Sequence, residues 1–136
     1  MALAATVFAV VDGVLFKPLA HGADLSVQAL SKYPGGAADV FMGSVATNDA
    51  GVARRVAAVV EDMGWYVSPD DAYLMLRGLR TLPVRLREHE RSGLEIARWL
   101  ETRPEVAAVL HPALPSFPDH ALWKRDFSGS NGLFGV

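Results

Sequence analysis

Lys32 is the residue whose type and position best suit covalent chemistry. It directly follows Ser31 at the end of an alternating apolar segment (23–30), and the turn 34–36 (Pro-Gly-Gly) comes next. The alternation predicts a buried strand, and ligand crevices form at the ends of strands in α/β sheets. A lysine there is partly desolvated, which favours the neutral amine that attacks carbonyls, while the Ser31 hydroxyl can bind a phosphate. The alternative is a lysine whose charged end simply reaches water from the end of a strand.

The four histidines form no compact metal set and no HExxH pair, so we predict no metal site. Segment 88–90 (Glu-His-Glu) lies in a charged helical stretch and indicates a solvated face. His111 and His120 flank a proline-rich loop and suit capping or packing. Residue types leave a Ser-His-Asp triad open, although no Gly-x-Ser-x-Gly segment marks a nucleophile. The absence of cysteine excludes thiolate catalysis and disulfides.

Composition indicates a globular protein of about one domain's length. The chain has 136 residues, of which 51% are hydrophobic and 21% are charged. A net charge of −2 without a basic stripe argues against nucleic-acid binding. No apolar run approaches the length of a membrane span, and segment 1–11 lacks the basic residues of a signal peptide. We therefore expect a cytoplasmic protein that binds neither nucleic acid nor membrane.

The elements that must position Lys32 follow from hydrophobic periodicity and capping residues. Residues 6–11 form an apolar run typical of a strand buried in a parallel sheet. An amphipathic helix is predicted from a cap at 47–49 to Gly64, and a second opens at Ser68 and runs to about Gly78. Pro83 predicts a kink or break. The remaining predicted elements are a charged helix over 84–102, a strand over 106–110 and a proline-rich loop over 111–117.

Several segments resemble, in register over about residues 13–136, the Cys/Met-metabolism enzymes that depend on pyridoxal phosphate. Segment 24–33 (DLSVQALSKY), followed by 39–43 (DVFMG), looks like the cofactor-lysine motif of that family, closest to its cystathionine β-lyase branch. The other matching segments are 13–22 (GVLFKPLAHG), 68–73 (SPDDAY), 77–82 (RGLRTL), 111–115 (HPALP), 123–127 (WKRDF) and 132–134 (GLF).

This resemblance implies that Lys32 carries pyridoxal 5'-phosphate as an internal aldimine and moves the substrate proton, and that Ser31 contacts the cofactor phosphate. It implies a carbon–sulfur lyase that acts on a small sulfur amino acid by β-elimination, with cystathionine giving homocysteine, pyruvate and ammonia. A partial parallel sheet exposes unpaired strand edges, so we also expect a homo-oligomer. The fold implied is α/β: part of a pyridoxal-phosphate-transferase-like (fold type I) large domain over 1–76, followed by the start of a small α+β domain over 77–136.

Departures from the family pattern concern the cofactor's surroundings. Val7 stands where the family has the aspartate that pairs with the pyridine nitrogen, and Ala37 stands where it has a histidine. The upstream half of the cofactor domain and the downstream arginine that holds the substrate carboxylate have no counterpart. We therefore expect a truncated internal fragment with an altered start, whose turnover is impaired or absent. The alternative is a non-catalytic remnant or an oligomerising interaction module.

Overall fold

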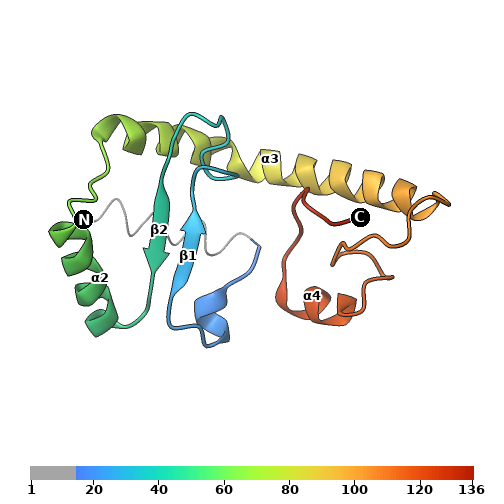
Figure 1. Cartoon of the computed structure of the whole chain (residues 1–136), viewed down its shortest axis with the longest axis horizontal. Coiled ribbons are helices and arrows are strands. Elements are labelled where there is room, and N and C mark those ends of the chain that lie inside the picture. The colour runs from blue at the N-terminus through green and yellow to red at the C-terminus, as the bar shows by residue number, and fades with distance from the viewer. Residues whose placement is uncertain (1–14) are drawn as a thin grey trace. The chain divides into compact units, whose positions relative to one another are not determined.

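The structure, a computed structural model, describes residues 15–136, and these fall into two compact units (Figure 1). One unit ends at Leu82 and the other spans Pro83–Val136. The predicted strand at 6–11, and Val7 with it, lies outside the described residues. The domain boundary expected between residues 76 and 77 stays a prediction.

The first unit contains a two-stranded antiparallel sheet. Strands β1 (Ser26–Ala29) and β2 (Gly43–Ala46) pair in a register that sets Ser26 opposite Ala46. A short 3-10 helix, η1 (Pro18–His21), precedes β1 and ends at Gly22, whose φ of 89° is in the left-handed region that glycine adopts without strain. The strand predicted within 23–30 is therefore present, and its residues Ser26–Ala29 pair with β2.

The predicted burial of this strand is wrong on its apolar face. Val27 is 72% exposed and Leu25 is 41% exposed, whereas Ser26 is only 5% exposed. Side chains alternate between the two faces of a strand, so burying Ser26 and Leu30 turns the valine and leucine outward. Among the described residues, nothing covers that outward face.

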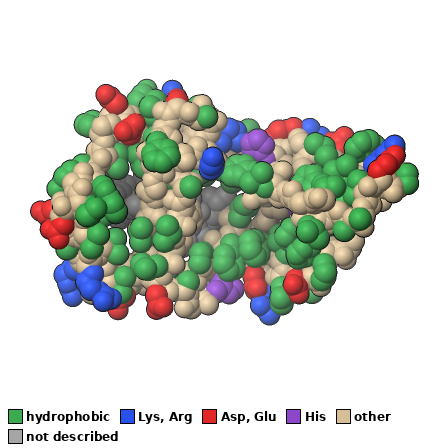
Figure 2. Space-filling model, in the orientation of Figure 1, with side chains coloured by type: hydrophobic (Ala, Val, Ile, Leu, Met, Phe, Trp, Pro, Cys, Tyr) green, Lys and Arg blue, Asp and Glu red, His purple; other side chains and the backbone are tan. Residues whose placement is uncertain are grey.

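Helix α2 (Ala50–Asp62) follows the predicted capping pattern. The Asp49 carboxylate accepts a hydrogen bond from the Val52 backbone N–H at 2.7 Å, and Gly64 beyond the helix end has a φ of 66°. Both predicted ends are therefore confirmed. The apolar stripe of α2 stays half-buried or exposed, with Val59 at 52% and Met63 at 58%. Figure 2 shows hydrophobic side chains at the surface in the part of the view that holds α2 and the two strands.

Helix α3 (Pro69–Glu101) opens as predicted, because the Ser68 hydroxyl accepts a hydrogen bond from the Asp71 N–H at 3.0 Å. Of the kink or break predicted at Pro83, the break is wrong, since α3 is continuous through it. An interior proline costs about 3 kcal/mol. Leu82 and Leu86 are both buried, and burying each leucine contributes about 1.5–3 kcal/mol, which offsets that cost.

The second unit packs the C-terminal half of α3 against the segments that follow it. Its buried core is Ala97, Val109 and Leu114. Helix α4 (His120–Asp126) comes after the proline-rich loop. The strand predicted over 106–110 is wrong: the Val106 N–H bonds to the Arg103 carbonyl in a turn, which leaves one isolated antiparallel bridge between Leu110 and Gly135.

None of the helices within residues 15–136 combines the length and the apolar character that crossing a membrane requires.

Candidate functional site

Lys32 lies in the turn that follows β1, and backbone hydrogen bonds fix the chain around it. The Gly35 N–H donates to the Leu30 carbonyl at 2.8 Å, and the Gly36 N–H donates to the Lys32 carbonyl at 2.9 Å. Ser31 is half-buried and Lys32 is exposed. The structure therefore brings Ser31 and Lys32 into one ordered turn, but the expected partial desolvation of Lys32 is wrong for the described residues. An amine on a turn that faces outward keeps its water.

The loop from Leu30 to Met42, which carries Lys32, closes on itself and on a small core. At its base the Leu30 N–H donates to the Met42 carbonyl at 2.9 Å. Leu30 and Val40, one on each limb, pack with Met75 of α3, and all three are at most 6% exposed. The core thus joins both limbs of the Lys32 loop to one helix.

Gly78 lets the Lys32 loop approach the backbone of α3. A Cβ atom at this position would lie 2.2 Å from the Gly35 carbonyl oxygen and 2.4 Å from that of Pro34. Real Cβ atoms do not come that close to backbone oxygens, so only glycine fits without a shift of the loop. In Figure 1 the segment that joins β1 to β2 reaches α3, in agreement with these distances.

An ion pair closes the other limb of the loop onto the same helix. The Arg77 guanidinium of α3 contacts the Asp39 carboxylate, and the two side chains are 47% and 37% exposed. Exposed ion pairs contribute at most about 1 kcal/mol to stability. This pair therefore adds little to stability, but it links the limb that carries Asp39 to α3.

Sequence reasoning did not assign roles to Asp39, Arg77 or Gly78, although all three belong to segments that carry the resemblance. The usable signal was Gly78 itself. A glycine in a helix interior costs about 1 kcal/mol relative to alanine and often marks a close approach of another backbone. No comparable signal distinguishes Asp39 and Arg77 from other charged surface residues.

The second unit holds a buried histidine in the proline-rich loop. His111 is 1% exposed, and its Nδ1 accepts a hydrogen bond from the Ala113 N–H at 3.1 Å. Its ring lies 5.6 Å from that of Phe134, and its Nε2 has no hydrogen-bond partner among residues 15–136. Burial lowers the pKa of His111 below its ordinary value, and the nearby Asn131 backbone opposes this only in part. The predicted packing role of His111 is confirmed.

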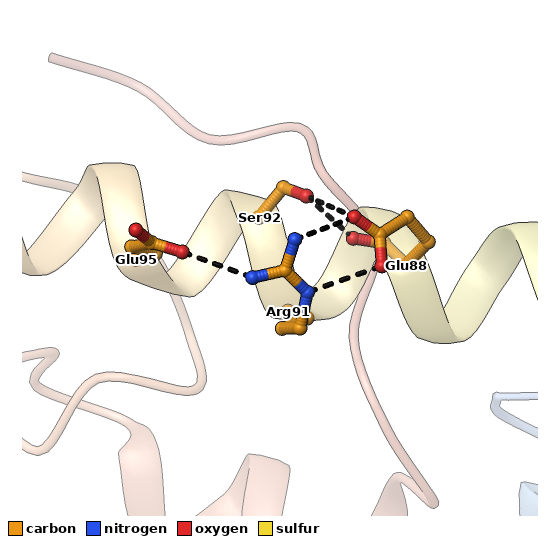
Figure 3. A network of polar contacts seen from close by, with 4 residues as sticks. All are labelled: Glu88, Arg91, Ser92 and Glu95. Atoms are coloured by element: carbon orange, nitrogen blue, oxygen red, sulfur yellow. Dashed lines mark hydrogen bonds and ion pairs between the residues drawn. The ribbon is translucent and has the colours of Figure 1, made fainter.

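Glu88 belongs to a solvated network on α3, as predicted (Figure 3). Arg91 donates to Glu88 at 2.6 and 3.1 Å and to Glu95 at 3.1 Å, and the Ser92 hydroxyl also reaches Glu88 at 3.1 Å. The hydrogen bonds from Arg91, and then from Ser92, lower the pKa of Glu88. Among residues 15–136, no three side chains of the metal-binding types gather into a possible metal site.

Known proteins are similar to this chain over most of its length. A sequence model of one family, described as "Cys/Met metabolism PLP-dependent enzyme", matches residues 4–136, ahead of the resemblance noted from residue 13. The cystathionine beta-lyase of Bordetella avium is 49% identical over 125 residues, which cover 92% of this chain and 32% of that protein. The cystathionine beta-lyase of Escherichia coli is 50% identical over 125 residues, which cover 90% of this chain and 31% of that protein. The chain thus spans about a third of the length of the curated relatives it matches.

A solved structure extends this likeness to the fold. The cystathionine gamma synthase of Xanthomonas oryzae pv. oryzae, in complex with aminoacrylate and cysteine, matches with a TM-score of 0.84 and 39% identity. The match covers 89% of this chain and 31% of that one. It confirms the predicted fold class, part of a fold type I domain with mixed helices and strands.

Proposed function

Because this chain belongs to the Cys/Met metabolism PLP-dependent enzyme family, we propose that Lys32 attaches pyridoxal phosphate and that Ser31 contacts its phosphate group. The observation that carries the proposal is the exposed amine of Lys32 on a turn fixed by two backbone hydrogen bonds, next to a hydroxyl. A lysine amine can bond to a carbonyl carbon, whereas an arginine guanidinium stays protonated and cannot. The described residues therefore fit a cofactor with an aldehyde and a phosphate.

We infer that the substrate is a thioether amino acid and that the reaction cleaves its carbon–sulfur bond at the β-carbon. Identities of 49% and 50% to proteins named cystathionine beta-lyase, against 44% to one named cystathionine gamma-lyase, favour the β-lyase reaction. When bound, the cofactor supplies an electron sink for the negative charge left at the α-carbon. The Lys32 amine, freed when the amino group of the substrate takes its place, would take up the α-proton and pass it to the departing sulfur. Cystathionine would then lose homocysteine, and water would convert the three-carbon remainder to pyruvate and ammonia.

Cofactor attachment and turnover are separate parts of this proposal. The chain spans about a third of its relatives' length, and Val7 replaces the residue expected to pair with the pyridine nitrogen. Orienting and electrostatic groups contribute several orders of magnitude to enzymatic rates. We therefore expect these 136 residues on their own to attach the cofactor but to turn over cystathionine at a background rate.

The test is to titrate the purified chain with pyridoxal phosphate and to record its visible absorption. We expect a band from covalent attachment that loses most of its intensity in Lys32→Ala and keeps it in Lys17→Ala, since Lys17 is equally exposed but lies outside the Lys32 turn. A band of unchanged intensity in Lys32→Ala, or no band at all, would contradict the proposal. Adding cystathionine and assaying pyruvate measures turnover separately.

A second candidate function is a non-catalytic module whose copies associate. The outward apolar side chains of β1 and α2, which nothing among the described residues covers, favour it. Such a module would show no Lys32-dependent band and would still associate. The two candidates are therefore separated by the absorption titration, and association alone supports either.

A further inference from the structure

The loop that carries Lys32 is held on α3 by residues that lie far from Lys32 in the sequence. We propose that Gly78 and the Arg77–Asp39 ion pair are positioning residues that fix the Lys32 turn for its reaction with an aldehyde; this rests on the proposed function of Lys32. Neither Gly78 nor the pair contacts the cofactor in this proposal. They act through the backbone on either side of the lysine.

Gly78 sets the depth at which the loop sits on the helix. The space that a Cβ atom at position 78 would fill is taken by the carbonyl groups of Pro34 and Gly35. Those two residues follow the Lys32 turn, and the Gly35 N–H closes it through the Leu30 carbonyl. A methyl group on residue 78 therefore has to push this backbone away, and the turn moves with it. Flexible side chains could yield to a methyl group, but backbone carbonyls cannot do so without moving the chain.

The Arg77–Asp39 pair limits the direction of the loop. Asp39 lies on the limb that returns from Lys32 to β2, next to the buried Val40, and Arg77 adjoins Gly78 on α3. Contacts on both limbs meet within one stretch of the helix, from Met75 to Gly78. The turn between the limbs then has little freedom to tilt, and the Lys32 side chain leaves the backbone from a defined place.

The experiment compares Lys32 with the other two lysines of the chain, which serve as internal standards. Lys17, Lys32 and Lys124 are all exposed, so accessibility alone does not separate them. The full chain is incubated with pyridoxal phosphate, attachment is fixed with borohydride, and the fraction modified at each lysine is measured by peptide mass spectrometry. In the unchanged chain we expect the modified fraction at Lys32 to exceed that at Lys17 and Lys124 by about fivefold or more, because a group held in place reacts faster than a mobile one.

The variants separate positioning from general stability. In Gly78→Ala we expect the modified fraction at Lys32 to fall to within about twofold of that at the other lysines. In Arg77→Met we expect the ratio of modification at Lys32 to that at the other lysines to fall by about twofold, and Arg77→Lys should restore part of this ratio. Alanine has the higher helix propensity, so loss of α3 cannot explain the first result. The controls Gly93→Ala, in the other unit, and Arg80→Met, on the same helix, should keep the preference. An unchanged preference in Gly78→Ala would overturn the inference.

A measurement without cofactor keeps this inference distinct from the proposed function. Amide hydrogen exchange at Gly35 and Gly36 reports the two bonds that close the turn. In Gly78→Ala we expect exchange there to rise by about tenfold while exchange in α3 stays slow. If the unchanged chain shows no preference for Lys32, the proposed function fails, and exchange alone then decides on positioning. Equal exchange rates in the two proteins would refute it.

Discussion

At the scale of single residues, His111 is a buried imidazole, and its hydrogen bond determines which ring nitrogen carries the proton. Its Nδ1 accepts the Ala113 N–H, so the neutral ring carries its proton on Nε2. A second proton would have to bind Nδ1, where it would face another N–H and break that hydrogen bond. Of the charged groups nearby, Glu90 favours the protonated ring and Arg98 disfavours it, and burial outweighs both. The neutral form is therefore part of the folded second unit.

We predict that the second unit loses stability as pH falls from 7 towards 5. The unfolded imidazole binds protons at its ordinary pKa of 6.5, and the folded one binds them only at lower pH because its pKa is lowered. Between these values the unfolded chain holds more protons, so the free energy of unfolding decreases as the pH falls, by at most about 1.4 kcal/mol per pH unit. Above pH 7 both forms are neutral and this dependence vanishes.

Urea denaturation followed by the fluorescence of Trp99 and Trp123, in a Trp65→Phe background, measures this effect. The control is His111→Gln, whose side-chain carbonyl can accept the Ala113 N–H and does not titrate. We expect its free energy of unfolding to vary less over this range of pH. If the free energy of unfolding changed equally with pH in both proteins, groups other than His111 would be responsible for the change.

At the scale of elements, helix α2 depends on its ends more than on its packing. None of its residues is buried, and isolated helices of this length are marginal in water. The Asp49 carboxylate supplies the cap, and its charge also suits the positive end of the helix dipole. Helix α3 differs, because buried leucines on either side of Pro83 hold it together.

We predict that Asp49→Ala unfolds part of α2, because losing an N-cap costs about 1 kcal/mol and little packing compensates. Circular dichroism at 222 nm should fall, and amide exchange should rise over Ala50–Asp62. Asp49→Asn keeps an oxygen acceptor and should preserve most of the signal. Asp62→Ala, at the other end of the helix, is the matched control, and an equal loss in that variant would argue against the cap.

Local signals explain which elements could be predicted from the sequence. Caps and helix-ending glycines act over a few residues, so the ends of α2 and the start of α3 follow from Asp49, Gly64 and Ser68. The continuity of α3 through Pro83 depends on the burial of leucines, which involves residues distant in the sequence. Within the part of the chain that the structure describes, the predicted 106–110 strand pairs only at Gly135, and a local sequence pattern does not show which segments will pair. The same holds within the candidate site, where Lys32 and Ser31 stand out by type but Asp39 and Arg77 do not.

At the scale of the whole molecule, the chain spans about a third of its relatives' length and exposes large apolar side chains in the first unit. Val27, Val59, Met63 and Trp65 are each more than half exposed. Soluble monomers rarely expose contiguous apolar patches larger than a few hundred Å². We propose that copies of the chain associate through these side chains.

We predict that light scattering detects species larger than the 14.6 kDa monomer, with a share that rises with concentration. The double variant Val27→Lys and Val59→Lys should shift the distribution towards monomer, because charges on β1 and α2 oppose apolar contact. Val136→Lys places the same substitution at an equally exposed valine in the second unit and should have little effect. A strictly monomeric unchanged chain would contradict the proposal.

The Lys32 loop has a consequence for the order of events during synthesis. Its closing hydrogen bonds, its small core, the glycine contact and the ion pair all involve residues between Leu30 and Leu79. Domains generally fold as units from the N-terminal end while the ribosome extends the chain. These contacts of the Lys32 loop can therefore all form before the residues of the second unit have left the exit tunnel. The turn that carries the reactive amine is then folded while the rest of the protein is still being made.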